Sequence, residues 1–92
     1  MLVSVIICTY RRPDYLDGVL RHLSVQAYRQ IEVIVVDGGG PAACEQSRRA
    51  AAAVTQQLNV RVIPSEKGLT RQRNIGLKAA QGDLICLLDD DV

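Results

Sequence analysis

The sequence predicts an open α/β domain in which strands and helices alternate as β-α-β-α-β-α-β around a mostly parallel sheet. Two observations predict this fold class. Four short runs are rich in β-branched and other apolar residues, and each interval between two runs carries a helical pattern. The first, second and fourth runs are nearly continuous in apolar character, which is typical of strands covered by helices on both faces. Right-handed crossovers then connect the strands, and 92 residues form one Rossmann-like domain at most.

The apolar runs give the expected strands, and periodicity and capping give the helices. The strands span residues 3–8, 32–37, 60–64 and 84–88. The first helix begins at Pro13, where a missing N–H costs nothing. Its apolar stripe at i, i+3, i+4 and i+7 consists of Leu16, Val19, Leu20 and Leu23. A second, alanine-rich helix is expected over residues 42–58, and a third over residues 69–80, ended by Gly82.

Composition narrows the classes of function. The net charge is +1 at pH 7 and the aromatic residues are three tyrosines, so no nucleic-acid partner is expected. The cysteine count is odd and no C-x-x-C spacing occurs. We therefore expect Cys8 and Cys86 to be free, buried hydrophobes in a reducing compartment. A cytoplasmic protein fits this pattern, with membrane association of the full-length protein left open.

Polar residues follow the ends of the expected strands. Ligands of open α/β sheets bind at the carboxyl ends of the strands. Because parallel strands end at one edge, the sequence predicts a site of mixed acidic, basic and glycine-rich character there. Its candidate members are Thr9, Tyr10, Arg11 and Arg12 after the first strand, Asp37 and glycines 38–40 after the second, Glu66, Lys67 and Gly68 before the third helix, and Asp89, Asp90 and Asp91 after the fourth strand.

The three adjacent carboxylates of Asp89, Asp90 and Asp91 repel one another unless a cation or a set of donors neutralises them. Oxygen ligands favour a hard divalent ion such as Mg²⁺ or Mn²⁺. Because Mg²⁺ usually combines one or two carboxylates with phosphate oxygens, a metal here implies a phosphate-bearing ligand. The alternative is a solvated acidic loop end.

Two further groups each leave an alternative open. Asp37 is followed by glycines that would let a ligand approach the backbone, so its carboxylate could bind a base or ribose. It could equally belong to an ordinary βα turn.

Arg71 and Arg73 are two residues apart, so one can face the site and the other solvent. An arginine at a helix N-terminus suits pyrophosphate, and the alternative is a solvated helix face.

The segment after the first strand also admits two interpretations. Thr9 and Tyr10 could contact a base while Arg11 and Arg12 reach phosphate. Alternatively, the threonine caps and the tyrosine packs against the following helix. His22 lies within the first helix, away from this edge, and the sequence offers no Ser/His/Asp or Cys/His arrangement for nucleophilic catalysis.

Taken together, four segments resemble the N-terminal half of a family 2 glycosyltransferase with the GT-A fold. They read VSVIICTYRRPDYL, EVIVVDGGG, GLTRQRNIGLKAAQGD and LICLLDDDV, and they span nearly the whole chain. The resemblance implies that residues 1–92 are the nucleotide-diphospho-sugar-binding half of an enzyme that transfers a sugar from a nucleotide sugar. The chain departs from the family at Cys8 and Arg11, where proline and asparagine are common, and in the glycines after Asp37, where D-G-S is common.

The resemblance also implies roles for individual residues. Asp37 matches the acid that recognises the base, Arg73 matches an arginine near the nucleotide, and the triple aspartate matches the D-x-D element. The implied nucleotide-binding residues are Thr9, Tyr10, Arg12, Asp37, Arg73, Asp89 and Asp90. The implied ligands of a Mn²⁺ or Mg²⁺ ion that bridges the diphosphate are Asp91 and Asp89.

The resemblance places the acceptor-binding region and the catalytic base beyond residue 92. We therefore expect the chain to be a fragment that transfers no sugar by itself, with a saccharide, lipid or polymer as acceptor. One alternative is a non-catalytic nucleotide-binding α/β module. A receiver-type domain is disfavoured, because it needs an acidic pair where Thr9 and Tyr10 follow the first strand.

The fourth strand carries an expectation about assembly. In the strand order 3-2-1-4, residues 84–88 form one edge of the sheet with an apolar sequence that contains no lysine or proline. Such an edge is prone to pair with another strand, so we expect self-association through it. The acidic ends at Asp83 and Asp89 oppose parallel, in-register pairing and favour the antiparallel arrangement.

Overall fold

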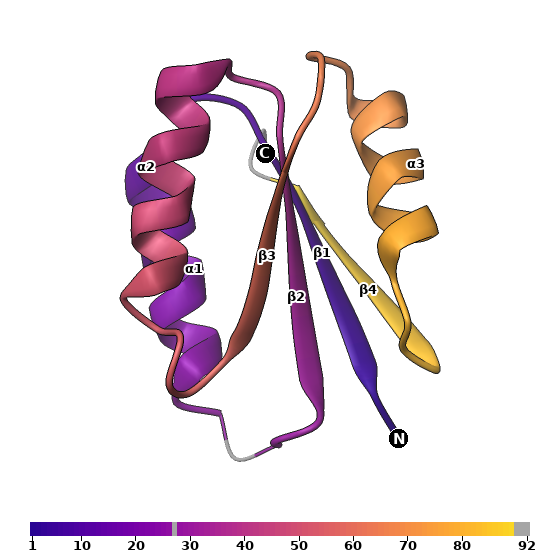
Figure 1. Ribbon diagram of the computed structural model, residues 1–92. Coiled ribbons are helices and arrows are strands. Elements are labelled where there is room, and N and C mark those ends of the chain that lie inside the picture. The colour runs from indigo at the N-terminus through magenta and orange to yellow at the C-terminus, as the bar shows by residue number, and fades with distance from the viewer. Residues whose placement is uncertain (27, 90–92) are drawn as a thin grey trace.

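The computed structural model describes residues 1–26 and 28–89, and nothing of the side chain of Asp89. Strands and helices alternate in the predicted order (Figure 1). The elements are β1 (Val3–Thr9), α1 (Pro13–Ser24), β2 (Ile31–Asp37), α2 (Pro41–Ala52), β3 (Asn59–Pro64), α3 (Leu69–Ala79) and β4 (Leu84–Asp89). No helix among these residues is long and apolar enough to cross a membrane.

The four strands form one parallel sheet in the order β3-β2-β1-β4, which confirms the predicted fold class and strand order. Thr9 at the end of β1 pairs with Asp37 at the end of β2, and Asp37 pairs with Pro64 at the end of β3. On the other side of β1, Cys8 pairs with Asp89. The carboxyl ends of all four strands therefore lie at one edge of the sheet, as the sequence predicts.

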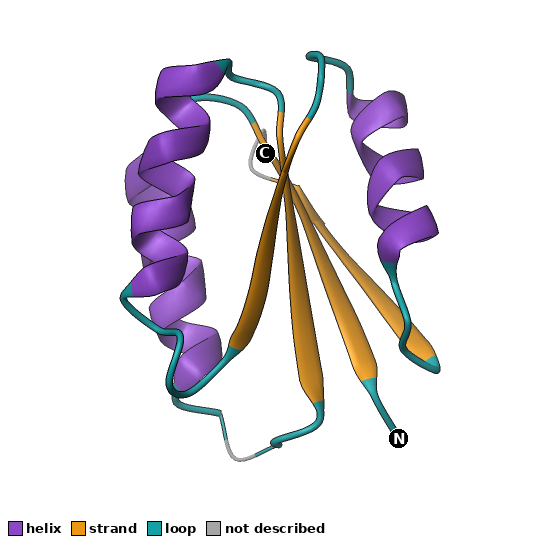
Figure 2. Cartoon of the chain, in the orientation of Figure 1, coloured by secondary structure: helices purple, strands orange, loops and turns teal. Residues whose placement is uncertain are grey.

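Helices cover both faces of the sheet. Figure 2 shows α1 and α2 together on one face and α3 on the other. Side chains of β1 and β2 alternate between two buried clusters, because successive residues of a strand point to opposite faces. The α1 and α2 side holds Val5, Ile7, Leu16, Leu20, Val33, Val35, Val54 and Leu58. The α3 side holds Ile6, Cys8, Ile34 and Val36.

The second helix is shorter than the sequence predicts. It ends at Ala52, and residues 53–57 form turns instead of the expected helix to residue 58. Val54 and Leu58 are nevertheless buried against the sheet. The alanines favour a helix, but the chain must turn here to begin β3 at Asn59, and this tertiary demand overrides a weak local propensity.

The prediction that the fourth strand is covered on both faces is wrong for this chain. Leu84, Ile85 and Leu87 are 52%, 43% and 44% exposed, and Cys86 is exposed as well, while Cys8 is buried as predicted. β4 lies at the edge, and α1, α2 and α3 pack over the other strands (Figure 1). An apolar run shows that a strand suits burial, but the run does not identify the element that buries it.

A polar network holds the amino ends of β1, β2 and β4 together. Glu32 is 4% exposed, and its Oε2 atom accepts hydrogen bonds from the Ser4 hydroxyl at 2.5 Å and the Gln81 N–H at 2.6 Å. The Gly82 N–H donates to Ser4 Oγ at 2.8 Å. A Cβ atom at Gly82 would lie 2.5 Å from that oxygen, so no larger residue fits. We call Ser4, Glu32, Gln81 and Gly82 the Glu32 network.

The Glu32 network controls the ionisation of its carboxylate. Burial alone would raise the pKa of Glu32, but the hydrogen bonds from Ser4, Gln81 and Gly82 and the charge of Arg61 together lower this pKa below the ordinary value of 4.5. A folded-state pKa below the unfolded value makes the ionised carboxylate a source of stability. That stability is fully present above the unfolded pKa and is lost as the pH falls through the folded pKa.

We expect Glu32→Gln to lower the free energy of unfolding at pH 7 by about 1–2 kcal/mol, because charge-assisted hydrogen bonds become neutral ones. The variant should also lose less stability than the wild type between pH 6 and pH 3.5, as measured by urea unfolding followed by circular dichroism. The matched control is Glu45→Gln, at an exposed site on α2. An equal loss of stability in acid for wild type and Glu32→Gln would contradict the assigned role.

Candidate functional site

The ends of β1, β2 and β3 bring three turns together at the carboxyl edge of the sheet. They comprise residues 10–12, 38–40 and 65–68. The Gly38 N–H donates to the Thr9 carbonyl at 3.0 Å, and the Ser65 N–H donates to the Asp37 carbonyl at 2.9 Å. Hydrogen bonds thus join the second turn to β1 and the third turn to β2.

Two cationic side chains lie close to the ring of Tyr10. Lys67 Nζ is 4.4 Å from the ring centroid and Arg11 Cζ is 5.2 Å from it. Cations at these distances interact favourably with an aromatic face. Arg11 Nε also donates to the Gly39 carbonyl at 3.3 Å, which links the first turn to the second. Arg11 has a φ of +53°, in the left-handed region that is unfavourable for a residue with a Cβ atom.

A cavity of about 440 Å³ opens beside this ring, between the end of β1 and the start of α3. Thr9, Tyr10 and Arg12, three of the predicted nucleotide-binding residues, line it from the β1 side. Its other wall contains Lys67, which was predicted to lie at this edge, and Gln72, which was not among the predicted site residues. No local signal distinguishes Gln72 from an exposed helix residue. The complete lining is Cys8, Thr9, Tyr10, Arg12, Lys67, Gly68, Leu69 and Gln72.

Asp37 is engaged within the protein. Its side chain is 1% exposed, and it accepts hydrogen bonds from the Gly39 N–H at 2.8 Å and the Ser47 hydroxyl at 2.5 Å. The carboxylate therefore fixes the turn after β2 to α2. Burial and the nearby charge of Asp37 raise the pKa of the Cys44 thiol. Recognition of a base by Asp37 remains a prediction, and it would have to use the lone pairs that these bonds leave.

The glycines after Asp37 have structural reasons of their own. A Cβ atom at Gly38 would lie 3.0 Å from Lys67 Cα, and one at Gly39 would lie 2.7 Å from Ala43 Cβ. Gly40 has a φ of +97°, where an L side chain is strained. We expected these glycines to let a ligand approach the backbone, but at the first two positions the close neighbours are protein atoms.

The two arginines of α3 differ in environment, as their spacing predicts. Arg71 pairs with Glu66, and both side chains are exposed, so this surface ion pair contributes little stability. Arg73 is partly buried, and its Nε atom is inaccessible to solvent. Arg73 is therefore the arginine that belongs to the interior side of the helix, and its predicted contact with a nucleotide remains a prediction.

The predicted metal and ribose ligands fall at the end of the described chain. β4 ends at Asp89, whose backbone is paired with Cys8 beside the first turn. The side chain of Asp89, together with Asp90 and Asp91, lies outside the described residues. Among the described side chains, those of residues 1–26 and 28–88, no group of three or more His, Cys, Asp and Glu could hold a metal ion.

The comparisons with known proteins agree on one family. The sequence model of Glycosyl transferase family 2 matches residues 4–92. The glycosyltransferase GlyG of Streptococcus pneumoniae is 33% identical over 93 residues, which cover 98% of this chain and 30% of GlyG. The chain thus spans less than a third of that relative.

Solved structures show the same relationship. Staphylococcus aureus TarS 1-349 in complex with UDP matches with a TM-score of 0.80 and 29% identity, over 99% of this chain and 28% of that one. A mannosyltransferase from Pyrobaculum calidifontis, PcManGT in complex with GDP-Man and Mn²⁺, matches with a TM-score of 0.84 and 27% identity. That match covers 95% of this chain and 26% of the mannosyltransferase.

We expect Ser47→Ala to lower the free energy of unfolding by about 1–3 kcal/mol, because it leaves a buried carboxylate oxygen of Asp37 without its hydroxyl donor. Ser24→Ala is the matched control, since the Ser24 hydroxyl donates to the Arg21 carbonyl at an exposed site. Urea unfolding followed by circular dichroism measures both variants. Equal, small losses for the two would show that Asp37 is not held through Ser47.

Proposed function

The chain belongs to glycosyl transferase family 2, and from that premise we propose that it is the part of a glycosyltransferase that binds the nucleotide-diphospho-sugar donor. The cavity at the carboxyl edge carries the proposal. It places an aromatic ring, two hydroxyl-bearing residues and cationic side chains at the position where open α/β sheets bind ligands. Two structures of similar fold contain UDP, or GDP-Man with Mn²⁺, which supports a nucleotide as the ligand class.

Each part of the cavity suits one part of such a donor. Thr9 and Tyr10 are the proposed contacts of the base, with the Tyr10 ring as the stacking surface. Lys67 and Arg12 oppose the negative charge of the diphosphate. The start of α3 adds its partial positive charge, and no acidic residue lies in its first turn. Within this proposal Asp37 contacts the base and Arg73 the nucleotide.

A divalent ion completes the proposed donor site. We assign it to Asp91 and Asp89, with Asp89 or Asp90 on the ribose, and Mn²⁺ or Mg²⁺ as the ion. The support is the D-x-D pattern that begins at Asp89, the last residue of β4, a strand that ends beside the cavity-lining turn of β1. When bound, such an ion neutralises diphosphate charge as the nucleotide leaves. The residues of this chain then hold the base and phosphates in place.

Sugar transfer also needs an acceptor and a general base within hydrogen-bond reach of the acceptor hydroxyl. The residues at this edge are assigned to the donor, so we propose that both features belong to the part of such enzymes that this chain does not span. The acceptor is then a saccharide, a lipid or a polymer.

We place the protein in the cytoplasm, and the odd number of cysteines without metal-ligand spacing supports that placement.

The two edges of the sheet differ in a way that supports self-association through β4. The β3 edge contains Arg61, whose guanidinium donates to the Ala79 carbonyl at 2.8 Å, and ends at Pro64. Charged residues and proline protect an edge from pairing. The β4 edge exposes Leu84, Ile85 and Leu87, and none of its residues is lysine, arginine or proline.

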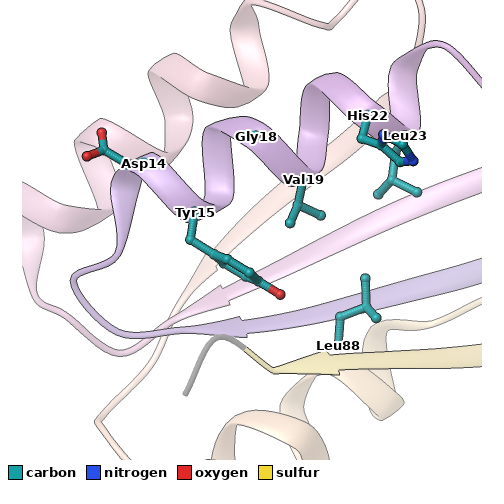
Figure 3. A pocket seen from close by; sticks show the side chains of 7 residues that line it. All are labelled: Asp14, Tyr15, Gly18, Val19, His22, Leu23 and Leu88. Carbon is teal, nitrogen blue, oxygen red and sulfur yellow. The ribbon is translucent and has the colours of Figure 1, made fainter. Parts of the chain in front are cut away.

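An apolar groove of about 540 Å³ lies beside β4 on the face that α1 covers, next to Leu88, whereas Ile85 and Leu87 point to the opposite face of the sheet. Figure 3 shows Tyr15 and Val19 of α1 and Leu88 of β4 pointing into the groove. We propose that a second copy of this chain covers the surface, with its β4 antiparallel to the first. That arrangement avoids stacking the acidic strand ends in register, as parallel pairing would.

The metal assignment predicts that Mn²⁺ strengthens the binding of UDP or GDP by about 10-fold or more, and that Asp91→Ala removes this gain. Isothermal titration with Mn²⁺ and with a chelator measures the difference. Asp17→Ala is the matched control, since Asp17 pairs with Arg21 on the exposed side of α1. Equal affinity in the chelator and in Mn²⁺ would remove the metal from the proposal.

The assembly proposal predicts a concentration-dependent dimer. Light scattering across a concentration series should show the molar mass rising towards twice the 10.1 kDa of the chain. Leu87→Lys should keep the protein monomeric, because a lysine on an edge strand opposes pairing. The control variant Leu77→Lys, at a similarly exposed leucine of α3, should still dimerise. A wild-type protein that stays monomeric at all concentrations would show that this edge is tolerated unpaired.

A further inference from the structure

The side chain of Gln72 joins three segments of the chain near the cavity: the end of β1, the end of β2 and the turn before α3. Gln72 is the fourth residue of α3 and is 4% exposed. Its Nε2 atom donates to the Thr9 carbonyl at 3.0 Å and to the Val36 carbonyl at 2.9 Å. Its Oε1 atom accepts from the Gly68 N–H at 3.2 Å. Both amide donors and the amide acceptor are therefore used inside the protein.

These bonds hold together parts of the chain that secondary structure alone leaves separate. The Thr9 carbonyl also accepts the Gly38 N–H at 3.0 Å, so α3 and the turn after β2 meet at one oxygen at the end of β1. The fit is close: a Cβ atom at Gly38 would lie 3.2 Å from Gln72 Cδ. At a buried site, water cannot readily replace these bonds, so losing the Gln72 amide removes the link between α3 and the ends of β1 and β2.

The same bonds set the distance between the two walls of the cavity. Thr9 and Tyr10 form one wall, while Lys67 and Gly68 form the other. The Gln72 amide is bonded directly to Thr9 on the first wall and to Gly68 on the second. Tyr10 directly follows Thr9 in the sequence, and Lys67 directly precedes Gly68. The 4.4 Å separation between Lys67 Nζ and the Tyr10 ring centroid is therefore measured between residues adjacent to the two that Gln72 holds.

We propose that Gln72 is a positioning residue for the nucleotide: it fixes the spacing between the Tyr10 wall and the Lys67 wall, and it acts on the ligand through them. This inference rests on the proposed function of the cavity. Because its amide is occupied internally, Gln72 need not touch the ligand itself. Only an amide of this length supplies two donors and one acceptor at this point, so neither an acid nor an apolar residue of equal size can replace it.

Two substitutions of similar size separate this role from simple filling of space. Gln72→Met keeps the length and removes all three hydrogen bonds. Gln72→Glu keeps the acceptor for Gly68 but directs an ionised carboxylate at two carbonyl oxygens. When the carboxyl is protonated, it regains one donor, so its defect must shrink as the pH falls. The matched control is Gln56→Glu, the same change at an exposed site after α2.

The experiment measures the dissociation constants of UDP and of GDP with Mn²⁺, by isothermal titration of the 92-residue chain at pH 8 and pH 6. Gln72→Met and Gln72→Glu are expected to bind about 10-fold or more weakly than the wild type at pH 8, and Gln56→Glu to bind equally. For Gln72→Glu alone, the dissociation constant divided by that of the wild type should be several-fold smaller at pH 6 than at pH 8. Gln72→Met and Gln72→Glu variants that bind both nucleotides as the wild type does would overturn the inference.

A second measurement uses the wild type and covers variants that fail to fold. The side-chain amide protons of Gln72 and the backbone N–H of Gly68 should exchange slowly with solvent in nuclear magnetic resonance spectra of the free chain. Exchange as fast as that of the Gln56 side chain would overturn the positioning role whatever the ligand. Protected protons in a wild-type chain that binds neither UDP nor GDP would instead count against the proposed function of the cavity.

Discussion

The position of β1 is the constraint on which the rest of the structure depends. It pairs in parallel with β2 on one side and β4 on the other, and every residue from 4 to 9 is buried. Helices pack over both of its faces, so β1 cannot shift without breaking two ladders and two apolar clusters. Because all strands run the same way, fixing β1 also fixes which turns meet at the carboxyl edge, and the cavity follows from that.

Two buried carboxylates on β2 hold the loops at opposite ends of this frame. Glu32 accepts from the Ser4 hydroxyl and from a backbone N–H before β4, and Asp37 accepts from the Ser47 hydroxyl and from a backbone N–H before α2. Each arrangement gives a buried charge several donors, which makes burial tolerable. The Glu32 network sets where β4 begins, and hence where the acidic end of β4 lies beside β1.

The strand order 3-2-1-4 was predicted as the usual order of such sheets. Local patterns predicted the strands, α1 and α3, because β-branched runs, an apolar helical stripe and capping residues depend on neighbours in sequence. They failed where the outcome depends on distant parts of the chain. The alanines after residue 52 could not reveal that the chain must turn towards β3, and the apolar residues 84–88 could not reveal an uncovered edge. The gathering of Thr9, Tyr10 and Arg12 was predictable from topology. The internal engagement of Asp37 and the three bonds of Gln72 were not. The bonds of Gln72 to Thr9 and Val36 join residues far apart in sequence, and no local pattern singles out Ser47 as the partner of Asp37.

The charges at the carboxyl edge are arranged so that cations rather than acids border the cavity. Among the described residues, the carboxylate of Asp37 is taken up by Gly39 and Ser47, and that of Glu66 by Arg71. Lys67 and Arg11 instead lie against the neutral ring of Tyr10, an arrangement that keeps their charge available to an anion. Arg11 does so from a left-handed backbone conformation, which costs about 1–2 kcal/mol for a residue with a side chain. This residue turns the chain between Tyr10 and Arg12, both of which line the cavity, so the backbone conformation of Arg11 sets how the two side chains follow one another along its wall.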